Sequence, residues 1–149
     1  METISLLPMA REPADFELAY ALKREALGPH VIPRWGWDEA SQRATMQEKI
    51  RAKTFHRIVA GGETVGVIAI DDEDDGAIEI GEFYIAPRFQ ARGIGSRVLE
   101  TVLADARTKS RAVRLQCIKW NPACGLYRRH GFAVVRETEN HYVMERPPN

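Results

Sequence analysis

FYIAPRFQARGIGS, the segment Phe83–Ser96, is the stretch that decides the fold of this chain. Aromatic and β-branched residues lead up to Pro87, which cannot donate to a strand ladder, so a strand is predicted to end there. After the glycines, Ile94, Val98 and Val102 recur every four residues and predict an amphipathic helix. The stretch is therefore predicted to be a strand, a glycine-containing turn and a helix.

The turn Gln90–Ser96 is a candidate anion-binding site. The first N–H groups of a helix have no partner within the helix, and they lie at the positive end of its dipole. Glycines allow the backbone to approach a ligand closely, so such a turn can hold a pyrophosphate. A tight turn without a ligand is the alternative. The lysine of a P-loop is absent, and Val98 stands where a GxGxxG fingerprint has its third glycine.

Outward from this unit, the sequence pattern predicts an α/β fold. Gly61–Gly62 between two apolar runs indicates a hairpin, and Gly28–Pro29 is expected to end the first helix. Strands are predicted at Thr3–Leu7, His56–Ala60, Thr64–Ile70, Ala77–Ile85, Ala112–Ile118, Phe132–Glu137 and His141–Glu145. Helices are predicted at Pro13–Leu27, Ile94–Ala106 and Ala123–His130, and a further helix, capped by Asp38, is predicted to run to about Ala52.

Composition limits the function classes. The chain has 149 residues, which fits one domain spanning 1–149, and it carries 21 basic and 21 acidic residues. This balance gives no general attraction to nucleic acid or to an anionic membrane. No apolar run is long enough to span a membrane, and no signal peptide is recognised. Cys117 and Cys124 are too few for a disulfide framework, so a cytoplasmic location is expected.

Two linked motifs resemble those of the GCN5-related N-acetyltransferases, the GNAT family. One is Gln/Arg-x-x-Gly-x-Gly/Ala, and the other is an asparagine followed by Leu-Tyr and then Gly-Phe. The likeness is good over Glu63–Glu145 and is closest to a bacterial branch of small GNAT proteins with a WGWDE segment. It implies a mixed, twisted sheet of about seven strands with helices on both faces. The matching residues are Gln90, Gly93, Gly95, Asn121, Leu126, Tyr127, Gly131 and Phe132.

The resemblance implies that acetyl-CoA binds as acyl donor and that no metal is needed. In the family, the strands before the glycine turn and before the asparagine splay apart, and the pantetheine arm pairs between them like an added strand. Phe83 and Ile85 would supply main-chain groups to the arm, and Asn121 would bond its amides. The predicted cofactor-binding residues are Phe83, Ile85, Gln90, Ala91, Arg92, Gly93, Ile94, Gly95, Ser96, Asn121 and Tyr127.

The same resemblance suggests catalytic residues for acetyl transfer to an amine. Tyr127 matches the family's general acid, which assists departure of the thiolate. Because a free tyrosine has a pKa about 1.5 units above that of a thiol, Tyr127 is expected mainly to donate a hydrogen bond. Glu79 and Glu82 are the candidate bases, and alternation along a strand predicts that they face opposite sides. Glu79 matches a catalytic glutamate of some members, while a histidine or water is the alternative base.

Aromatic residues and a histidine are candidates for binding the acceptor. Trp35 and Trp37 fall in the connection that borders the acceptor cleft of this fold, where an indole ring can bind a cation. His141 is a further candidate. The predicted function is acetyl transfer to a primary amine of a small molecule or peptide, by direct attack in a ternary complex. The alternative is an acyl-CoA-binding module without turnover, and a homodimer remains open.

Overall fold

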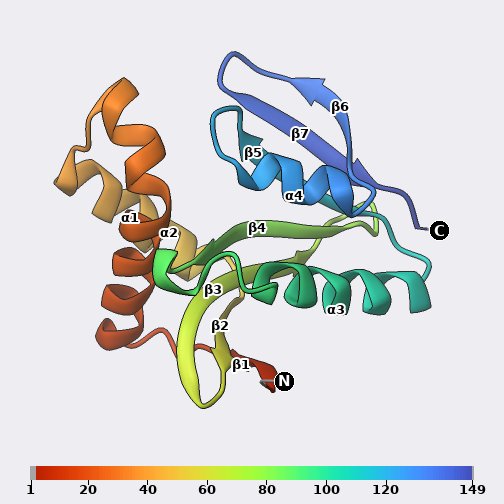
Figure 1. Cartoon of the computed structure of the whole chain (residues 1–149), viewed down its shortest axis with the longest axis horizontal. Helices are drawn as coiled ribbons and strands as arrows, with labels where there is room; N and C mark the ends of the chain where they lie inside the picture. The colour runs from red at the N-terminus through yellow and green to blue at the C-terminus, as the bar shows by residue number, and fades with distance from the viewer. Residues whose placement is uncertain (1–2, 149) are drawn as a thin grey trace.

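A computed structural model describes residues 3–148 and contains a seven-stranded sheet with the order β1-β2-β3-β4-β5-β7-β6 (Figure 1). Only β4 and β5 run parallel, and the other neighbours are antiparallel, so the sheet is mixed as expected. The strands are β1 (Ile4–Pro8), β2 (Phe55–Ala60), β3 (Glu63–Asp72), β4 (Ile78–Ile85), β5 (Val113–Ile118), β6 (Ala133–Glu137) and β7 (His141–Arg146).

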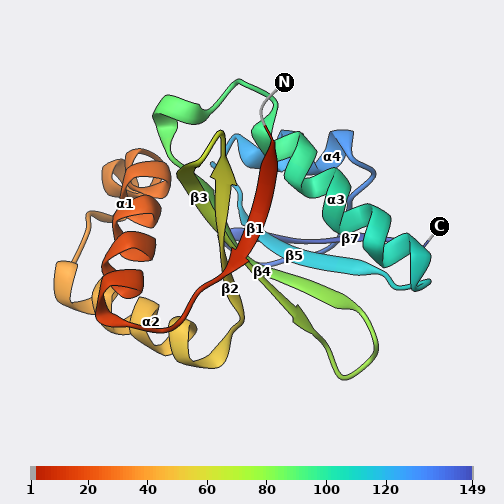
Figure 2. The same cartoon turned by 90° about the horizontal axis from the view of Figure 1, so that it is seen from below.

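Helices cover both faces of this sheet, which confirms the predicted fold class. Figure 2 shows α1 and α2 on one side, with α3 and α4 on the other. The side of α3 that faces the sheet carries the buried residues Ile94, Val98, Leu99, Val102, Leu103 and Ala106, so the predicted apolar stripe builds the core. The helices are α1 (Pro13–Trp35), α2 (Glu39–Ala52), α3 (Ile94–Thr108) and α4 (Ala123–Arg129), with a 3-10 turn at Pro87–Phe89.

The predicted end of α1 at Leu27 is wrong, because the helix continues through Gly28, Pro29 and Pro33 to Trp35. A proline inside a helix removes one backbone hydrogen bond, a cost that tertiary packing must offset. Leu27 and Val31 are both buried, and this burial on either side of Pro29 provides the offset. The helix ends where Gly36 adopts φ 69° and donates its N–H to the Ile32 carbonyl.

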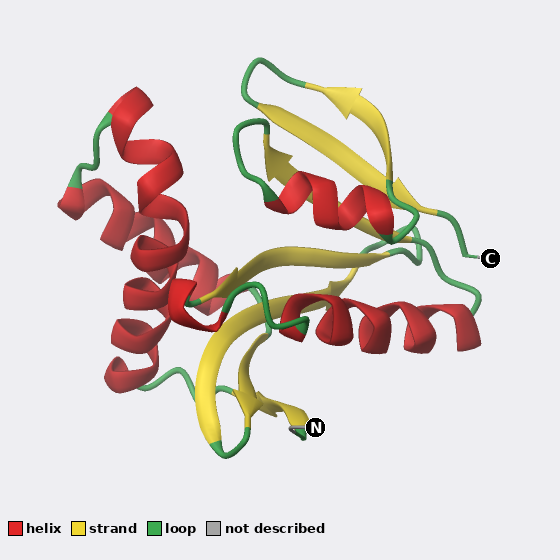
Figure 3. Ribbon diagram, viewed as in Figure 1, coloured by secondary structure: helices red, strands yellow, loops and turns green. Residues whose placement is uncertain are grey.

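Strands β4 and β5 pair over only a short length and then separate. Their parallel pairing covers Ile78–Ile80 of β4, whereas β5 pairs with β7 along its whole length. The half of β4 from Gly81 to Ile85 therefore has no partner on its β5 side, and Figure 3 shows the two strands diverging there. This confirms the splay that the family resemblance implies, and it leaves backbone N–H and C=O groups of β4 open to a ligand.

Candidate active site

Two cavities meet where β4 and β5 separate. The first, here the loop-side cavity, has a volume of about 520 Å³ and is bounded mainly by the glycine turn, the start of α3, and α4. The second, the helix-side cavity, has a volume of about 430 Å³ and lies among α1, α2, β4 and β5. Four residues line both cavities: Phe83, Tyr84, Asn121 and Tyr127. These residues form the junction, so a reaction there would have access from both sides of the sheet.

The glycine turn has the backbone that an anion site requires. Gly93 has φ 77° at the N-cap of α3, and Ala91 has φ 61°, so two nearby residues adopt the left-handed conformation. Within residues 3–148, the N–H groups of Ile94, Gly95 and Ser96 donate to no backbone carbonyl, as expected for the first turn of a helix. Their open donors line the loop-side cavity and fit a pyrophosphate.

The other predicted residues of the turn have different environments. The Gln90 side-chain amide donates to the Ile85 carbonyl at 2.8 Å, which fixes the turn against the end of β4. Gln90 and Ala91 line the loop-side cavity together with the three α3 residues above. Arg92 does not line it, because its guanidinium lies over the Phe89 ring. The prediction that Arg92 contacts the cofactor therefore stays a prediction.

Asn121 and Tyr127 lie together at the junction although six residues separate them in sequence. The Asn121 Oδ1 accepts a hydrogen bond from the Ala123 N–H at 2.9 Å, in an Asx turn that leads into α4. The Asn121 NH₂ group then remains to donate to a ligand. One turn further along α4, the Tyr127 ring packs near Phe83 and against Phe132.

Tyr127 is buried, with 6% of its surface exposed, and within the described part of the chain its hydroxyl has no hydrogen-bond partner. Burial raises the pKa of Tyr127 well above its ordinary value, and the negative charge of Glu82 raises it further. The hydroxyl therefore keeps its proton and is an open hydrogen-bond donor at the junction. A raised pKa makes full proton transfer to a thiolate less favourable and strengthens the case for hydrogen-bond donation.

One stripe of α1 forms a wall of the helix-side cavity. Lys23, Leu27, Val31 and Trp35 follow one another every four residues and all line it, as i,i+4 side chains share a helix face. This stripe crosses the predicted helix end, so the sequence analysis missed it. Had the periodicity been followed past Gly28–Pro29, it would have predicted the wall.

Glu79 and Glu82 both line this cavity, and both pair with lysines from the side of α1 and α2. The Glu79 Oε1 lies 2.8 Å from the Lys53 Nζ, and the Glu82 Oε1 lies 3.1 Å from the Lys49 Nζ. The expectation that the two carboxylates face opposite sides is therefore wrong. The β3–β4 register shifts between Ala69 and Ile70, so that β4 has an extra residue, and such a bulge interrupts the alternation of side chains.

The two predicted tryptophans lie in different environments. Trp35 lines the helix-side cavity and packs edge-on against Trp120, with ring centroids 4.9 Å apart. Trp37 does not line the cavity, since its Nε1 donates to the Tyr20 hydroxyl at 2.8 Å between α1 and α2. The placement of Trp37 at the acceptor site is thus not supported by the geometry. His141, at the start of β7, does line the helix-side cavity.

A disulfide between Cys117 on β5 and Cys124 on α4 is a feature that the sequence analysis did not predict. The two cysteines bracket Asn121, and Cys117 lines the helix-side cavity. The bond therefore links the strand and the helix that position Asn121 and Tyr127. Their separation of seven residues gave no recognisable signal, since it matches no common redox or metal motif.

A model of the acetyltransferase (GNAT) family matches residues 19–132, which is most of the chain. The chain belongs to the GNAT family. This GNAT protein is therefore an acetyltransferase, and the match includes the glycine turn, Asn121 and Tyr127. A search of curated protein sequences finds no match.

Solved structures confirm the GNAT fold. The PaiA N-acetyltransferase from Thermoplasma acidophilum, solved in complex with coenzyme A, shares 17% identity at a TM-score of 0.75, over 97% of this chain and 99% of its own. An acetyltransferase from Thermus thermophilus shares 17% identity at a TM-score of 0.76, with 99% of both chains covered. The ribosomal-protein-S18-alanine N-acetyltransferase from Escherichia coli shares 19% identity at a TM-score of 0.67, over 100% of this chain and 95% of its own.

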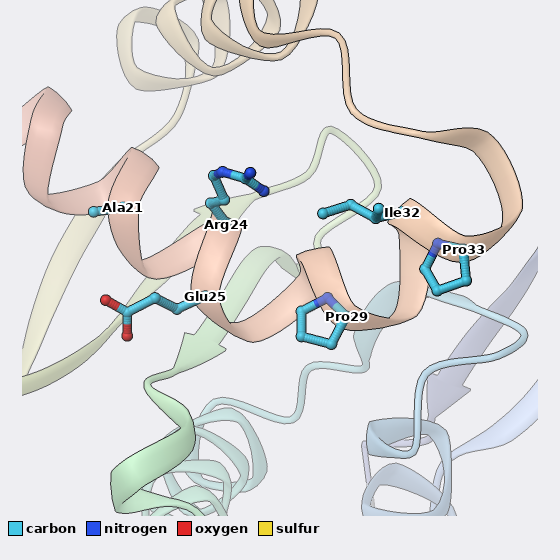
Figure 4. A pocket seen from close by; sticks show the side chains of 6 residues that line it. All are labelled: Ala21, Arg24, Glu25, Pro29, Ile32 and Pro33. Atoms are coloured by element: carbon cyan, nitrogen blue, oxygen red, sulfur yellow. The ribbon is translucent and has the colours of Figure 1, made fainter.

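Three further observations complete the description of residues 3–148. In residues 3–148, no group of three or more His, Cys, Asp or Glu side chains could hold a metal ion. Over the same residues, no helix is both long and apolar enough to cross a membrane. A shallow hollow on a different face of α1, lined by Ala21, Arg24, Glu25, Pro29, Ile32 and Pro33, lies apart from both cavities (Figure 4).

Proposed function

We propose that this GNAT protein transfers an acetyl group from acetyl-CoA to a primary amine by direct attack within a ternary complex. The observation that carries the proposal is the junction, where Phe83, Tyr84, Asn121 and Tyr127 line both cavities. A donor in the loop-side cavity and an acceptor in the helix-side cavity would meet there. Holding two reactants in contact removes much of the entropic cost of their encounter.

The loop-side cavity fits the donor. The open N–H groups of Ile94, Gly95 and Ser96 would hold the pyrophosphate. The edge of β4 that has no strand partner, at Phe83 and at the Ile85 N–H, would bind the pantetheine arm, while the Ile85 carbonyl stays bonded to Gln90. The Asn121 NH₂ group would donate to an amide carbonyl of the arm. Acetyl-CoA, when bound, supplies a thioester carbonyl that an amine can attack. Every group of the chain in this scheme lines the same cavity.

Tyr127 would assist departure of the thiolate by donating a hydrogen bond to the sulfur. Its hydroxyl keeps its proton, has no hydrogen-bond partner among the described residues and borders both cavities. A donor in a site with little water stabilises a developing negative charge more than it would in solution. Tyr127 thus stabilises the leaving group without having to give up its proton fully.

Glu82 is better placed than Glu79 to take the proton of the amine. It is next to Phe83 at the junction, it accepts a hydrogen bond from the Tyr84 hydroxyl at 3.2 Å, and its charge acts on Tyr127. Glu79 lies three residues back along β4 and is paired with Lys53, so it would need a water molecule to reach an amine at the junction. We therefore assign the base to Glu82, with Glu79 as the alternative from the sequence motif.

Thiol release with a panel of primary amines tests the proposal. We expect release of free CoA to rise with amine concentration for at least one amine, and the acetylated amine to appear in equal amount by mass spectrometry. Glu82→Gln should slow release at neutral pH more than Glu79→Gln does. Tight binding of acetyl-CoA without amine-dependent thiol release from any amine would instead support a non-catalytic acyl-CoA-binding module.

A further inference from the structure

The helix-side cavity contains a cluster of charged residues, here called the lysine cluster. Neither binding of the donor at the glycine turn nor stabilisation of the thiolate by Tyr127 requires its lysines. Three lysines and two glutamates line the cavity: Lys23, Lys49, Lys53, Glu79 and Glu82. With all five ionised, the lysine cluster carries a net charge of +1, since three positive charges meet two negative ones. A single monoanionic group would make it neutral.

The unbalanced charge is concentrated around Lys23. Lys23 is 4% exposed, and its Nζ lies 3.8 Å from the Glu82 Oε1, which is too long for a hydrogen bond. The same Glu82 oxygen is already bonded to the Lys49 Nζ at 3.1 Å. Among the described residues, no carboxylate other than Glu82 lies within ion-pair distance of either lysine. Two ammonium groups thus share one carboxylate at a buried site.

The energetics of Lys23 agree with this geometry. Burial lowers the pKa of Lys23, and the neighbouring Lys49 lowers it further, while Glu82 only partly opposes them. A buried ammonium group is stable only when it is paired and hydrogen-bonded. Lys23 would therefore gain from a second anion that reached it through the cavity it lines.

We propose that the acceptor amine also carries a carboxylate, which binds between Lys23 and Lys49. This inference rests on the proposed function, because it names the class of acceptor that the helix-side cavity takes. The amine of such a molecule would lie at the junction beside Tyr127, and its carboxylate would lie at the Lys23 end of the α1 stripe. Leu27 and Val31 of the same stripe would pack against an apolar part of the acceptor. Amino acids and similar amino carboxylates have this chemistry.

Matched acceptors test the inference through turnover. Each amino acid of a panel, such as leucine or phenylalanine, is compared with its amide, which keeps the amine and side chain and lacks the negative charge. We expect kcat/KM for the preferred amino acid to exceed that for its amide by about tenfold or more, or ~1.4 kcal/mol for each factor of ten. Equal kcat/KM for both members of every pair would overturn the inference and leave the proposed function intact.

Binding provides a second test that needs no turnover. N-acetyl amino acids and their amides are titrated into the CoA-bound protein by isothermal calorimetry. We expect the carboxylate form to bind about tenfold more tightly. If no carboxylate is preferred over its amide, the inference fails, whether or not any amine is acetylated. Loss of acetylation with a retained preference for carboxylates would count against the proposed function alone.

Variants locate the effect in the lysine cluster. Lys23→Met keeps an unbranched side chain, one atom shorter, and removes the charge, and Lys49→Met does the same at a more accessible position. Both should reduce the preference for carboxylate over amide to about twofold or less. Lys109→Met, on the far end of α3 where Lys109 pairs with Asp105, is the matched control and should leave the preference unchanged. A full preference retained in folded Lys23→Met and Lys49→Met proteins would overturn the assignment.

Discussion

Tyr127 combines a packed ring with an unused hydroxyl. Its ring contacts Phe83 and Phe132, whereas its hydroxyl has no partner among residues 3–148. The hydroxyl is not among the fully buried, unpaired side-chain atoms of the described residues, so it borders the cavities that Tyr127 lines and is open to a ligand. This imbalance is what an open donor in a reaction site would show.

Tyr127→Phe should therefore separate catalysis from folding. The variant keeps the ring and removes the donor, so we expect turnover to fall by about tenfold or more, or ~1.4 kcal/mol for each factor of ten. Affinity for acetyl-CoA and the melting temperature should change little, because the hydroxyl has no partner in the described chain. Steady-state kinetics, calorimetric titration with acetyl-CoA and thermal unfolding measure the three. Wild-type turnover in this variant would remove Tyr127 from the mechanism.

The pH dependence of turnover gives a second check at this residue. Because burial raises the pKa of Tyr127 above its ordinary value of 10.0, the folded protein keeps the hydroxyl protonated where a free tyrosine begins to ionise. The ionisation of Tyr127 should therefore not reduce turnover near pH 10. The kcat profiles of wild type and Tyr127→Phe should have the same shape in that range. The unfolded chain ionises first, so Tyr127 lowers the stability of the fold only as the pH rises above about 10. Profiles of kcat for both proteins up to the alkaline limit of folding measure the effect.

Variants of Trp35 and Trp37 test which of the two tryptophans contacts the acceptor. Trp35 is 49% exposed and lines the helix-side cavity, so Trp35→Ala should raise the KM for the acceptor severalfold with little loss of stability. Trp37 is bonded to Tyr20, so Trp37→Phe should lower the free energy of unfolding by ~1 kcal/mol and leave that KM unchanged. Kinetics and urea unfolding of both variants give the comparison. The opposite pattern would place Trp37, and not Trp35, at the acceptor.

At the scale of elements, the join between β4 and α3 depends on its backbone conformation. A side chain at Gly93 would meet no atom within 4 Å, yet its φ of 77° is one that other residues avoid. The constraint is thus conformational, because a residue with a Cβ loses ~1–2 kcal/mol of stability in this left-handed conformation. Relief of that strain would rotate the amides at the start of α3.

Gly93→Val should weaken acetyl-CoA binding severalfold or more, because it disturbs the amides that face the pyrophosphate. Gly76→Val is the matched control, since Gly76 also has a positive φ, 89°, and open space around it, but lies in the β3–β4 turn away from the loop-side cavity. Both variants should lose similar stability, and only Gly93→Val should lose affinity in calorimetric titrations. Equal dissociation constants for the two folded variants would rule out this use of the turn.

At the scale of the whole molecule, the two cavities meet at the splay between β4 and β5. Under the proposed function, donor and acceptor would occupy the protein together, and the reaction would need no acetylated enzyme. The chain's two cysteines are joined to each other and offer no free thiol as a nucleophile. This arrangement favours a sequential mechanism over a ping-pong mechanism.

Initial velocities should confirm a sequential mechanism. With donor and acceptor both varied, double-reciprocal plots should intersect, and protein incubated with acetyl-CoA alone should gain no acetyl group by mass spectrometry. Parallel lines together with a stoichiometric acetyl adduct would show that the acetyl group passes through the protein.

The sequence by itself determined the local elements and the family, and it predicted which residues line the loop-side cavity. Runs of β-branched and aromatic residues between glycine and proline turn signals predicted all seven strands, and four-residue spacing predicted the buried face of α3. The glycine turn, Asn121 and Tyr127 were found because one short segment carries each signal. The same local reasoning ended α1 at Leu27, since it could not count the burial of Val31 beyond Pro29.

Tertiary structure alone decided what surrounds the junction. A one-residue bulge in β4 brings Glu79 and Glu82 to the same side, and neighbouring helices then bring Lys23, Lys49 and Lys53 to them. It also separated Trp35, at a cavity wall, from Trp37, in an inter-helix contact. No sequence period encodes such contacts, because register and the packing of distant helices depend on the free energy of the whole fold.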